Sequence, residues 1–375
     1  MLLSKVKRSL TAVAGLALLG NAGGAAADYA LNLRQGVTSI SREAYDLHML
    51  ILWICVAIGA VVFTAMFISI FNHRKSKGAQ PAQFHESTTV EIIWTIVPFL
   101  ILIGIAIPAT KALVAMEDTS NSDLSIKVTG YQWKWGYDYL DNGVSFISTL
   151  TTPREQIENQ QDKGLNYLLE VDNPVVVPVD KKVRLLITAN DVIHSWWVPD
   201  FGMKKDAIPG FVNEMWFRVE EESTYRGQCA ELCGKDHGFM PIVVIAKNEA
   251  DYQQWVTDQK SQMDAASAGA DRDWAMAELM ERGEKAYNTS CGACHQANGE
   301  GVPGAFPGLK GSAIATGAKD AHVAIVMNGK PGTAMAGFAA QLNDIDLAAL
   351  ITYERNAWGN NTGDLVQPSE IKAAR

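Results

Sequence analysis

The stretch Gly227-Gln228-Cys229-Ala230-Glu231-Leu232-Cys233-Gly234 decides the fold of the middle of this chain. His237 and Met240 follow this stretch closely. His194 lies upstream of it, and one apolar run, residues 215–219, lies between them. Around it lie short apolar or β-branched runs that Gly, Pro, Asn and Asp separate, at residues 124–129, 175–179, 183–188, 215–219 and 241–246. Such runs predict an antiparallel β-sandwich or barrel. We expect this domain to span residues 113–256 and to bring the quoted loop and His194 together at one end.

The residue types in this loop predict a copper site. Thiolates, a thioether and imidazoles select copper over hard cations. Cys229 and Cys233 can each bridge two metal ions, which leaves His194 and His237 as terminal ligands. Met240 and a backbone carbonyl would complete the two coordination spheres, so the pattern predicts a dinuclear centre. A Cys229–Cys233 disulfide and a structural zinc site are the alternatives, although neither requires Met240 or His194 at these positions.

A second motif, Cys291-Gly292-Ala293-Cys294-His295, predicts covalent attachment of a c-type haem. His295 would be the proximal iron ligand. For the sixth ligand we favour Met335, which lies in the loop Gly332-Thr333-Ala334-Met335-Ala336-Gly337-Phe338. Met327 is the rival and His322 a poorer one, because residues 321–327 have helical spacing, where Met commonly packs in the core. The alternative is a redox disulfide followed by a chance histidine.

Helical periodicity at residues 274–287 and 344–358 predicts an all-α domain over residues 273–375. Residues 261–273 are rich in Ala, Ser, Gly and Asp and offer little to bury. This composition predicts a linker over residues 257–272.

The N-terminal part predicts export and membrane anchoring. Residues 1–27 have the basic, apolar and small-residue parts of a signal peptide. Residues 49–71 and 92–109 are uncharged and predict a transmembrane hairpin within residues 28–112. Cleavage after Ala27 would leave the mature N-terminus outside, with the basic loop at 73–77 in the cytoplasm. Both metal motifs would then lie in the periplasm of a bacterial inner-membrane protein.

Composition limits the partners. A hydrophobic content of 48% suits soluble domains attached to a few spans, and a net charge of −9 argues against nucleic acid binding. The charge allows an acidic face for a basic redox partner. Four of the five cysteines fall in the two motifs, and the fifth, Cys55, is expected to pack within the first span.

Three segments carry a family resemblance: His194-Ser195-Trp196-Trp197-Val198-Pro199, Asp206-Ala207-Ile208-Pro209-Gly210 and the loop quoted first. They resemble subunit II of cytochrome c oxidase, over residues 45–255. The resemblance implies a cupredoxin-like domain with a dinuclear CuA centre. Its ligands would be His194, Cys229, Cys233, His237, Met240 and the carbonyl of Glu231. It also implies that the Glu231 carboxylate contacts a magnesium ion shared with subunit I.

Two further residues take a role from the resemblance. Trp133 lies in the aromatic run at 130–137, which by itself is typical of strand packing. The resemblance implies instead that electrons enter at Trp133. Glu91 begins the second span, where the helix dipole favours a carboxylate. The resemblance implies that protons enter a pathway into subunit I at Glu91.

Together these features resemble a caa-type oxidase subunit II with a fused cytochrome c domain. The implied electron route runs from cytochrome c or a bc1-type reductase to haem c, to CuA and then to haem a. Haem a, haem a3, CuB and the oxygen site would belong to subunit I, and subunit III would be a further partner. The alternatives are an accessory subunit of a nitric oxide reductase and a redox or copper sensor without a catalytic partner.

Overall fold

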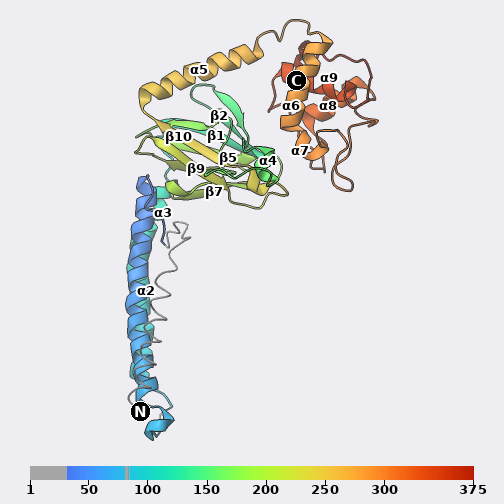
Figure 1. The fold of residues 1–375 in the computed structure, drawn as a ribbon. Coiled ribbons are helices and arrows are strands. Elements are labelled where there is room, and N and C mark those ends of the chain that lie inside the picture. Colours follow the sequence, from blue (N-terminus) through green and yellow to red (C-terminus); the bar gives the residue numbers. More distant parts are fainter. Residues whose placement is uncertain (1–31, 81–82, 84) are drawn as a thin grey trace, which may run out of the picture. The chain divides into compact units, whose positions relative to one another are not determined.

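The computed structural model describes residues 32–80, 83 and 85–375 (Figure 1). The predicted order of a helical hairpin segment, a β-sandwich and a helical domain is confirmed. The predicted signal peptide, residues 1–27, lies outside the described residues.

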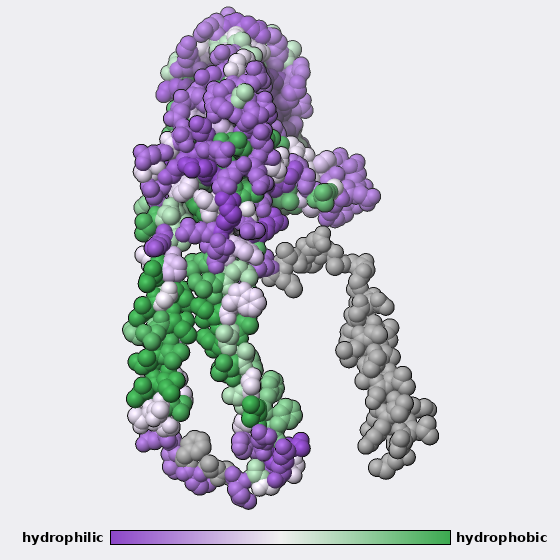
Figure 2. All heavy atoms as spheres, turned by 90° about the vertical axis from the view of Figure 1, so that its left-hand side faces the viewer, coloured by the Kyte–Doolittle hydropathy of each residue, from purple (hydrophilic) through white to green (hydrophobic). Residues whose placement is uncertain are grey.

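Two long apolar helices form the N-terminal part, α2 (Ser39–Asn72) and α3 (Thr88–Glu117), with a short 3-10 turn, η1 (Lys75–Lys77), between them in sequence. Both are long and apolar enough to cross a membrane, and Figure 2 shows mainly hydrophobic side chains along each. Both extend beyond the predicted spans. The uncharged residues are those that can lie in the hydrocarbon layer of a membrane, whereas capping determines where a helix ends. At the start of α2, Thr38 Oγ1 accepts from Ser41 N over 3.0 Å. Cys55 is exposed on α2 rather than packed within the chain.

The β-domain is a sandwich, and within the described residues each of its sheets has five strands. One sheet has the order β3-β2-β1-β5-β8, and the other has the order β4-β10-β9-β6-β7. The strands of the first sheet are β1 (Leu124–Tyr131), β2 (Lys134–Tyr139), β3 (Ser145–Ser148), β5 (Val183–Ala189) and β8 (Asn213–Phe217). Those of the second are β4 (Val175–Pro178), β6 (His194–Val198), β7 (Met203–Ala207), β9 (Ser223–Cys229) and β10 (Ile242–Lys247). Short helical turns, α4 (Arg154–Ile157), η2 (Pro199–Phe201) and η3 (His237–Phe239), occupy loops.

The predicted purely antiparallel arrangement is wrong, because β1 pairs with β5 and β4 pairs with β10 in parallel. Between β1 and β5, and between β4 and β10, the chain crosses to the other sheet and back. The second strand of each pair then runs in the same direction as the first. Apolar runs indicate where strands lie but carry no information on which strands pair or in which direction. Large aromatic side chains, among them Trp135, Trp196 and Phe217, fill the space between the sheets and are almost fully buried.

Much of the segment predicted as a linker, residues 257–272, is helical. Helix α5 (Glu249–Ser267) starts at Asn248, whose side chain accepts from Asp251 N, and continues to Ser267. The segment contains no Gly or Pro before Gly269, and its Ala, Gln and Lys residues favour helix. Tyr252 and Val256 on α5 are buried against the sandwich core. Composition indicated a segment with little to bury, but it did not indicate that most of this segment is helical.

The C-terminal domain is helical, as predicted. It contains α6 (Met276–Ser290), α7 (Gly292–His295), α8 (Lys319–Asn328), α9 (Asp344–Asn356) and α10 (Pro368–Ala374). Helices α6 and α9 pack closely at Gly283, where an added Cβ would lie 2.1 Å from the carbonyl oxygen of Ala349. This close approach fixes the end of α6, and therefore the start of the Cys291–His295 motif, against α9.

Candidate metal centres

The predicted copper ligands lie on two neighbouring strands and the loop that follows one of them. His194 is the first residue of β6, and Cys229 is the last residue of β9. These strands are adjacent and antiparallel, with Trp196 paired to Cys229. Cys233 and Met240 lie in the loop between β9 and β10, and His237 opens η3 within that loop. The fold therefore gathers residues that are far apart in sequence.

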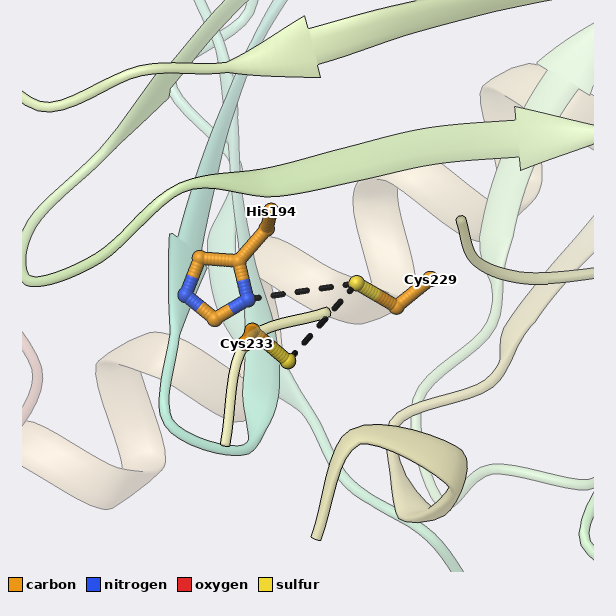
Figure 3. A group of neighbouring side chains, drawn as sticks. All are labelled: His194, Cys229 and Cys233. Atoms are coloured by element: carbon orange, nitrogen blue, oxygen red, sulfur yellow. Dashed lines mark hydrogen bonds between the residues drawn. The ribbon is translucent and has the colours of Figure 1, made fainter. Parts of the chain in front are cut away.

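The two cysteines are free thiols whose sulfurs lie 3.9 Å apart (Figure 3). The separation in a disulfide is ~2.05 Å, so the disulfide alternative does not describe this loop. His194 Nδ1 lies 4.0 Å from Cys229 Sγ. His194, Cys229 and Cys233 are all buried, and their ligand atoms lie within 4.8 Å of one another.

The other predicted ligand atoms surround the same sulfur pair. His237 Nδ1 lies 3.4 Å and Met240 Sδ lies 3.5 Å from Cys233 Sγ. The backbone oxygen of Glu231 lies 3.4 Å from Cys229 Sγ. Two sulfurs with nitrogen, thioether and carbonyl donors on both sides fit a thiolate-bridged copper pair. A single tetrahedral zinc ion would use four ligands and leave the thioether and the carbonyl without a role.

Charge is distributed unequally between the two thiols. A hydrogen bond from the Cys233 thiol lowers the pKa of Cys229, whereas the same interaction raises the pKa of Cys233. Burial disfavours the His194 imidazolium, but hydrogen bonds to Asp191 and Cys229 outweigh burial and raise the His194 pKa. Thiolates and neutral imidazoles are the forms that bind metal, so metal binding at this loop would be coupled to the release of protons.

Asp191 is a functional residue that the sequence reasoning missed. Its Oδ1 lies 2.8 Å from His194 Nε2, and its Oδ2 accepts from the backbone N of Gln132 over 2.7 Å. A carboxylate on the outer nitrogen of a ligand histidine fixes the tautomer and directs the other nitrogen to the metal. An aspartate three residues before a predicted ligand histidine was the available signal, although spacing alone does not show that the two side chains meet.

Trp133 lies in the turn between β1 and β2, beside the copper loop. It is half-buried and packs against the sandwich core, as the strand-packing interpretation expects. Its indole Nε1 also donates to the backbone oxygen of Cys233 over 3.2 Å. Trp133 therefore packs against the core and also lies next to a predicted copper ligand.

The two predicted carboxylates lie apart from this cluster. The Glu231 side chain is exposed, whereas its backbone oxygen faces the sulfur pair. Glu91 lies in the first turn of α3 and is exposed. Neither carboxylate belongs to the cluster of candidate metal ligands found within the described residues.

The haem motif lies at the junction of α6 and α7, beside a cavity. His295 Nδ1 donates to the backbone oxygen of Pro307 over 2.8 Å, which directs Nε2 to a metal. Within the helical domain the cavity is lined by Cys291, Cys294, His295 and Met335 and by apolar side chains such as Phe306, Leu309, Ile325 and Val326. Cysteines at one edge, an oriented imidazole and apolar walls fit a covalently attached haem.

The structure distinguishes between the candidate sixth ligands. Met335 lines the haem cavity together with His295. Met327 is buried in the core of the helical domain and is absent from the described lining of this cavity. His322 lines the cavity, but its Nε2 is bonded to Glu354. Met335 and His322 therefore both line the cavity, and of these two His322 is bonded to a carboxylate through its side chain.

Comparisons with known proteins agree with this arrangement. Residues 124–247 match the model of the cytochrome c oxidase subunit II periplasmic domain, and residues 26–112 match that of its transmembrane domain. Residues 277–353 match the model described as cytochrome c oxidase, cbb3-type, subunit III.

Relatives match about three fifths of the chain. A probable cytochrome c oxidase subunit 2 of Rickettsia bellii is 44% identical over 225 residues, which are 59% of this chain and 80% of the relative. Cytochrome c oxidase subunit 2 of Arabidopsis thaliana is 39% identical over 237 residues, which are 63% of this chain and 91% of the relative. The solved periplasmic domain of subunit II (CoxB) of Bradyrhizobium japonicum is 42% identical, with a TM-score of 0.35, and the match covers 38% of this chain and 98% of that domain. With its copper loop, apolar helices and added haem-binding domain, this chain belongs to the cytochrome c oxidase subunit II family.

Proposed function

We propose that the dinuclear copper of this electron-input subunit is held by six groups: the side chains of His194, Cys229, Cys233, His237 and Met240, and the backbone carbonyl of Glu231. The observation that carries this assignment is the 3.9 Å sulfur pair, which the other four donors surround. The chain is part of a haem-copper oxidase complex in the bacterial inner membrane, with its metal domains on the outer side. Its relatives are oxidase subunits, which favours this role over a nitric oxide reductase subunit or a sensor.

The protein residues prepare the site for electron transfer. When bound, the copper pair supplies a one-electron couple. Cys229, Cys233 and Met240 are buried and exclude water from it. Asp191 holds His194 with Nδ1 directed at the sulfur pair. Cys229 and Cys233 would hold the copper pair from one buried loop, and such a site would limit the structural change that accompanies a change of charge.

The haem c domain would supply electrons to this site. We assign the thioether links to Cys291 and Cys294 and the axial ligation to His295 and Met335. His/Met ligation raises the haem potential. A tethered donor has a high effective concentration, so this fusion makes electron delivery intramolecular.

Five finer assignments follow from the same family role. Electrons would reach copper through Trp133, whose indole is bonded to the Cys233 carbonyl. Glu91 would admit protons to a pathway in subunit I, and the exposed Glu231 carboxylate would share a magnesium ion with that subunit. The external donor would be cytochrome c or a bc1-type reductase, and subunit III would complete the complex.

Copper stoichiometry and electron paramagnetic resonance test the central assignment. The haem-loaded protein should bind two copper ions per chain and show the spectrum of an electron shared between two coppers. Cys229→Ser should abolish that spectrum and leave haem attachment intact. Cys55→Ser is the matched control, because Cys55 is an exposed thiol on α2, and it should change neither property. One copper per chain, or loss of haem in Cys229→Ser, would contradict the assignment.

A further inference from the structure

The haem cavity of the C-terminal domain is lined by a third side chain that can ligate iron. His322 lies in the first turns of α8, and Ile325 and Val326 line the cavity from the same helix face. His295 and Met335 line this cavity as well. Two imidazoles and one thioether therefore border a cavity that would hold one haem, whose iron would take two of these three side chains as ligands.

Glu354 on α9 restrains His322. Its Oε2 lies 2.9 Å from His322 Nε2, and the two side chains are only 4% and 2% exposed, respectively. Nδ1 of His322 is buried and has no hydrogen-bond partner among the described residues. The bond to Glu354 is thus the one that fixes the ring, and it occupies one of the two nitrogens that could bind a metal.

An ion pair or hydrogen-bonded pair this deeply buried is not explained by stability alone. Removing two acidic or basic groups from water is unfavourable, and replacing both with apolar side chains of similar volume is often neutral or stabilising. By contrast, removing Glu354 alone would leave a buried imidazole with neither nitrogen bonded. Such an imidazole would gain a partner by binding the iron of a haem held in the same cavity.

We infer that Glu354 keeps His322 off the haem iron and thereby selects Met335 as the sixth ligand. This inference rests on the proposed His295 and Met335 ligation. Glu354 acts as a positioning residue, because it acts through His322. Its effect is on the potential: Met ligation raises the haem potential, whereas a second imidazole would lower it and make reduction by the upstream donor less favourable.

The test compares five haem-loaded, full-length proteins: wild type, Glu354→Leu, Glu354→Asp, and the double variants Glu354→Leu/His322→Leu and Glu354→Asp/His322→Leu. Optical spectra report the long-wavelength charge-transfer band of Met-ligated ferric haem, and redox titration reports the potential. Mass spectrometry checks covalent attachment. We expect Glu354→Leu to lose the band and to have a lower potential, and its double variant to regain both. The shorter carboxylate of Glu354→Asp should give a partial loss, which adding His322→Leu should reverse.

The outcomes separate the inference from the function on which it rests. Retention of the wild-type band and potential in Glu354→Leu would overturn the inference alone. An equal loss in the single and double variants would also overturn it, because His322 would then not be the displacing ligand. If Glu354→Leu does not fold, full Met ligation in Glu354→Asp overturns the inference. Absence of the band from wild type would reject Met335 and the inference together.

Discussion

The indole of Trp133 donates to the backbone oxygen of Cys233 over 3.2 Å, and the side-chain nitrogen of Gln132 donates to the same oxygen over 2.8 Å. The turn between β1 and β2 is therefore bonded directly to the residue that carries a copper-binding sulfur. This contact places the aromatic side chain beside the proposed copper ligands.

Trp133→Phe should slow reduction of the copper centre while leaving its absorption and paramagnetic spectra unchanged. Phenylalanine keeps most of the packing but cannot donate to Cys233. Stopped-flow reduction by an external donor measures the rate. Trp216→Phe is the control, because the Trp216 indole donates to Ala115, away from the copper loop. Equal rates in wild type and Trp133→Phe would place electron input elsewhere.

Asp191→Asn should weaken copper binding by about 10- to 100-fold, the usual effect of losing an outer partner of a ligand histidine. An amide is a weaker acceptor than a carboxylate and also allows the other His194 tautomer. Competition with a copper chelator measures the affinity. Asp172→Asn makes the same chemical change at a residue that bonds Thr149, outside the site, and should have no effect. Unchanged affinity in Asp191→Asn would show that the strands alone orient His194.

Met335→Leu should abolish the Met–iron charge-transfer band and lower the haem potential, since leucine offers no ligand. Met327→Leu should retain both properties, because Met327 packs in the helical core. Spectra and redox titration of the two proteins decide between the residues. The reverse pattern would assign the sixth position to Met327.

Asp364→Asn should destabilise the helical domain at neutral pH by about 1–2 kcal/mol, the scale of a charge-assisted hydrogen bond reduced for solvent exposure. Hydrogen bonds from the buried Arg355 lower the pKa of Asp364 below its ordinary value. A carboxylate whose pKa is lowered on folding stabilises the fold above about pH 4, and this contribution disappears as the pH falls through the folded-state value.

The difference in unfolding free energy between wild type and Asp364→Asn should therefore be full at pH 7 and shrink below about pH 4. Denaturant titrations of the haem-loaded protein at several pH values measure it. Asp271→Asn is the control, because the pair of Asp271 with Lys372 is largely exposed and should contribute little. A difference that stays constant with pH would show that the carboxylate charge is not responsible.

The sequence was most informative where chemistry requires particular residue types at close spacing. Cys229, Cys233, His237 and Met240 lie in one loop, and the Cys291–His295 motif is continuous, so both groups could be found without a structure. The sequence was also sufficient for the strands near 124–129 and 183–188, because their apolar runs are long and have clear boundaries.

Contacts between distant segments could not be predicted in this way. Asp191 meets Gln132, His295 meets Pro307, and His322 meets Glu354 only because the folded chain brings their elements together. The parallel pairing of β1 with β5 had the same origin, since apolar spacing contains no information on strand direction. Helix α5 was missed for a different reason: an exposed sequence with few apolar residues can still have high helix propensity.

Because α5 is long, only a short segment without helical structure connects the two metal-binding domains. Met263 still packs against the sandwich core, whereas Gly269 already accepts from the Trp274 indole at the start of the haem domain. Arg282 of the haem domain also donates to the backbone oxygen of Ala266 over 3.3 Å, so only a few residues between Met263 and Gly269 separate the contacts of the two domains. Inserting flexible residues there would lengthen the tether and dilute the haem donor, so electron delivery should be more sensitive to length at this point than anywhere else along the connection.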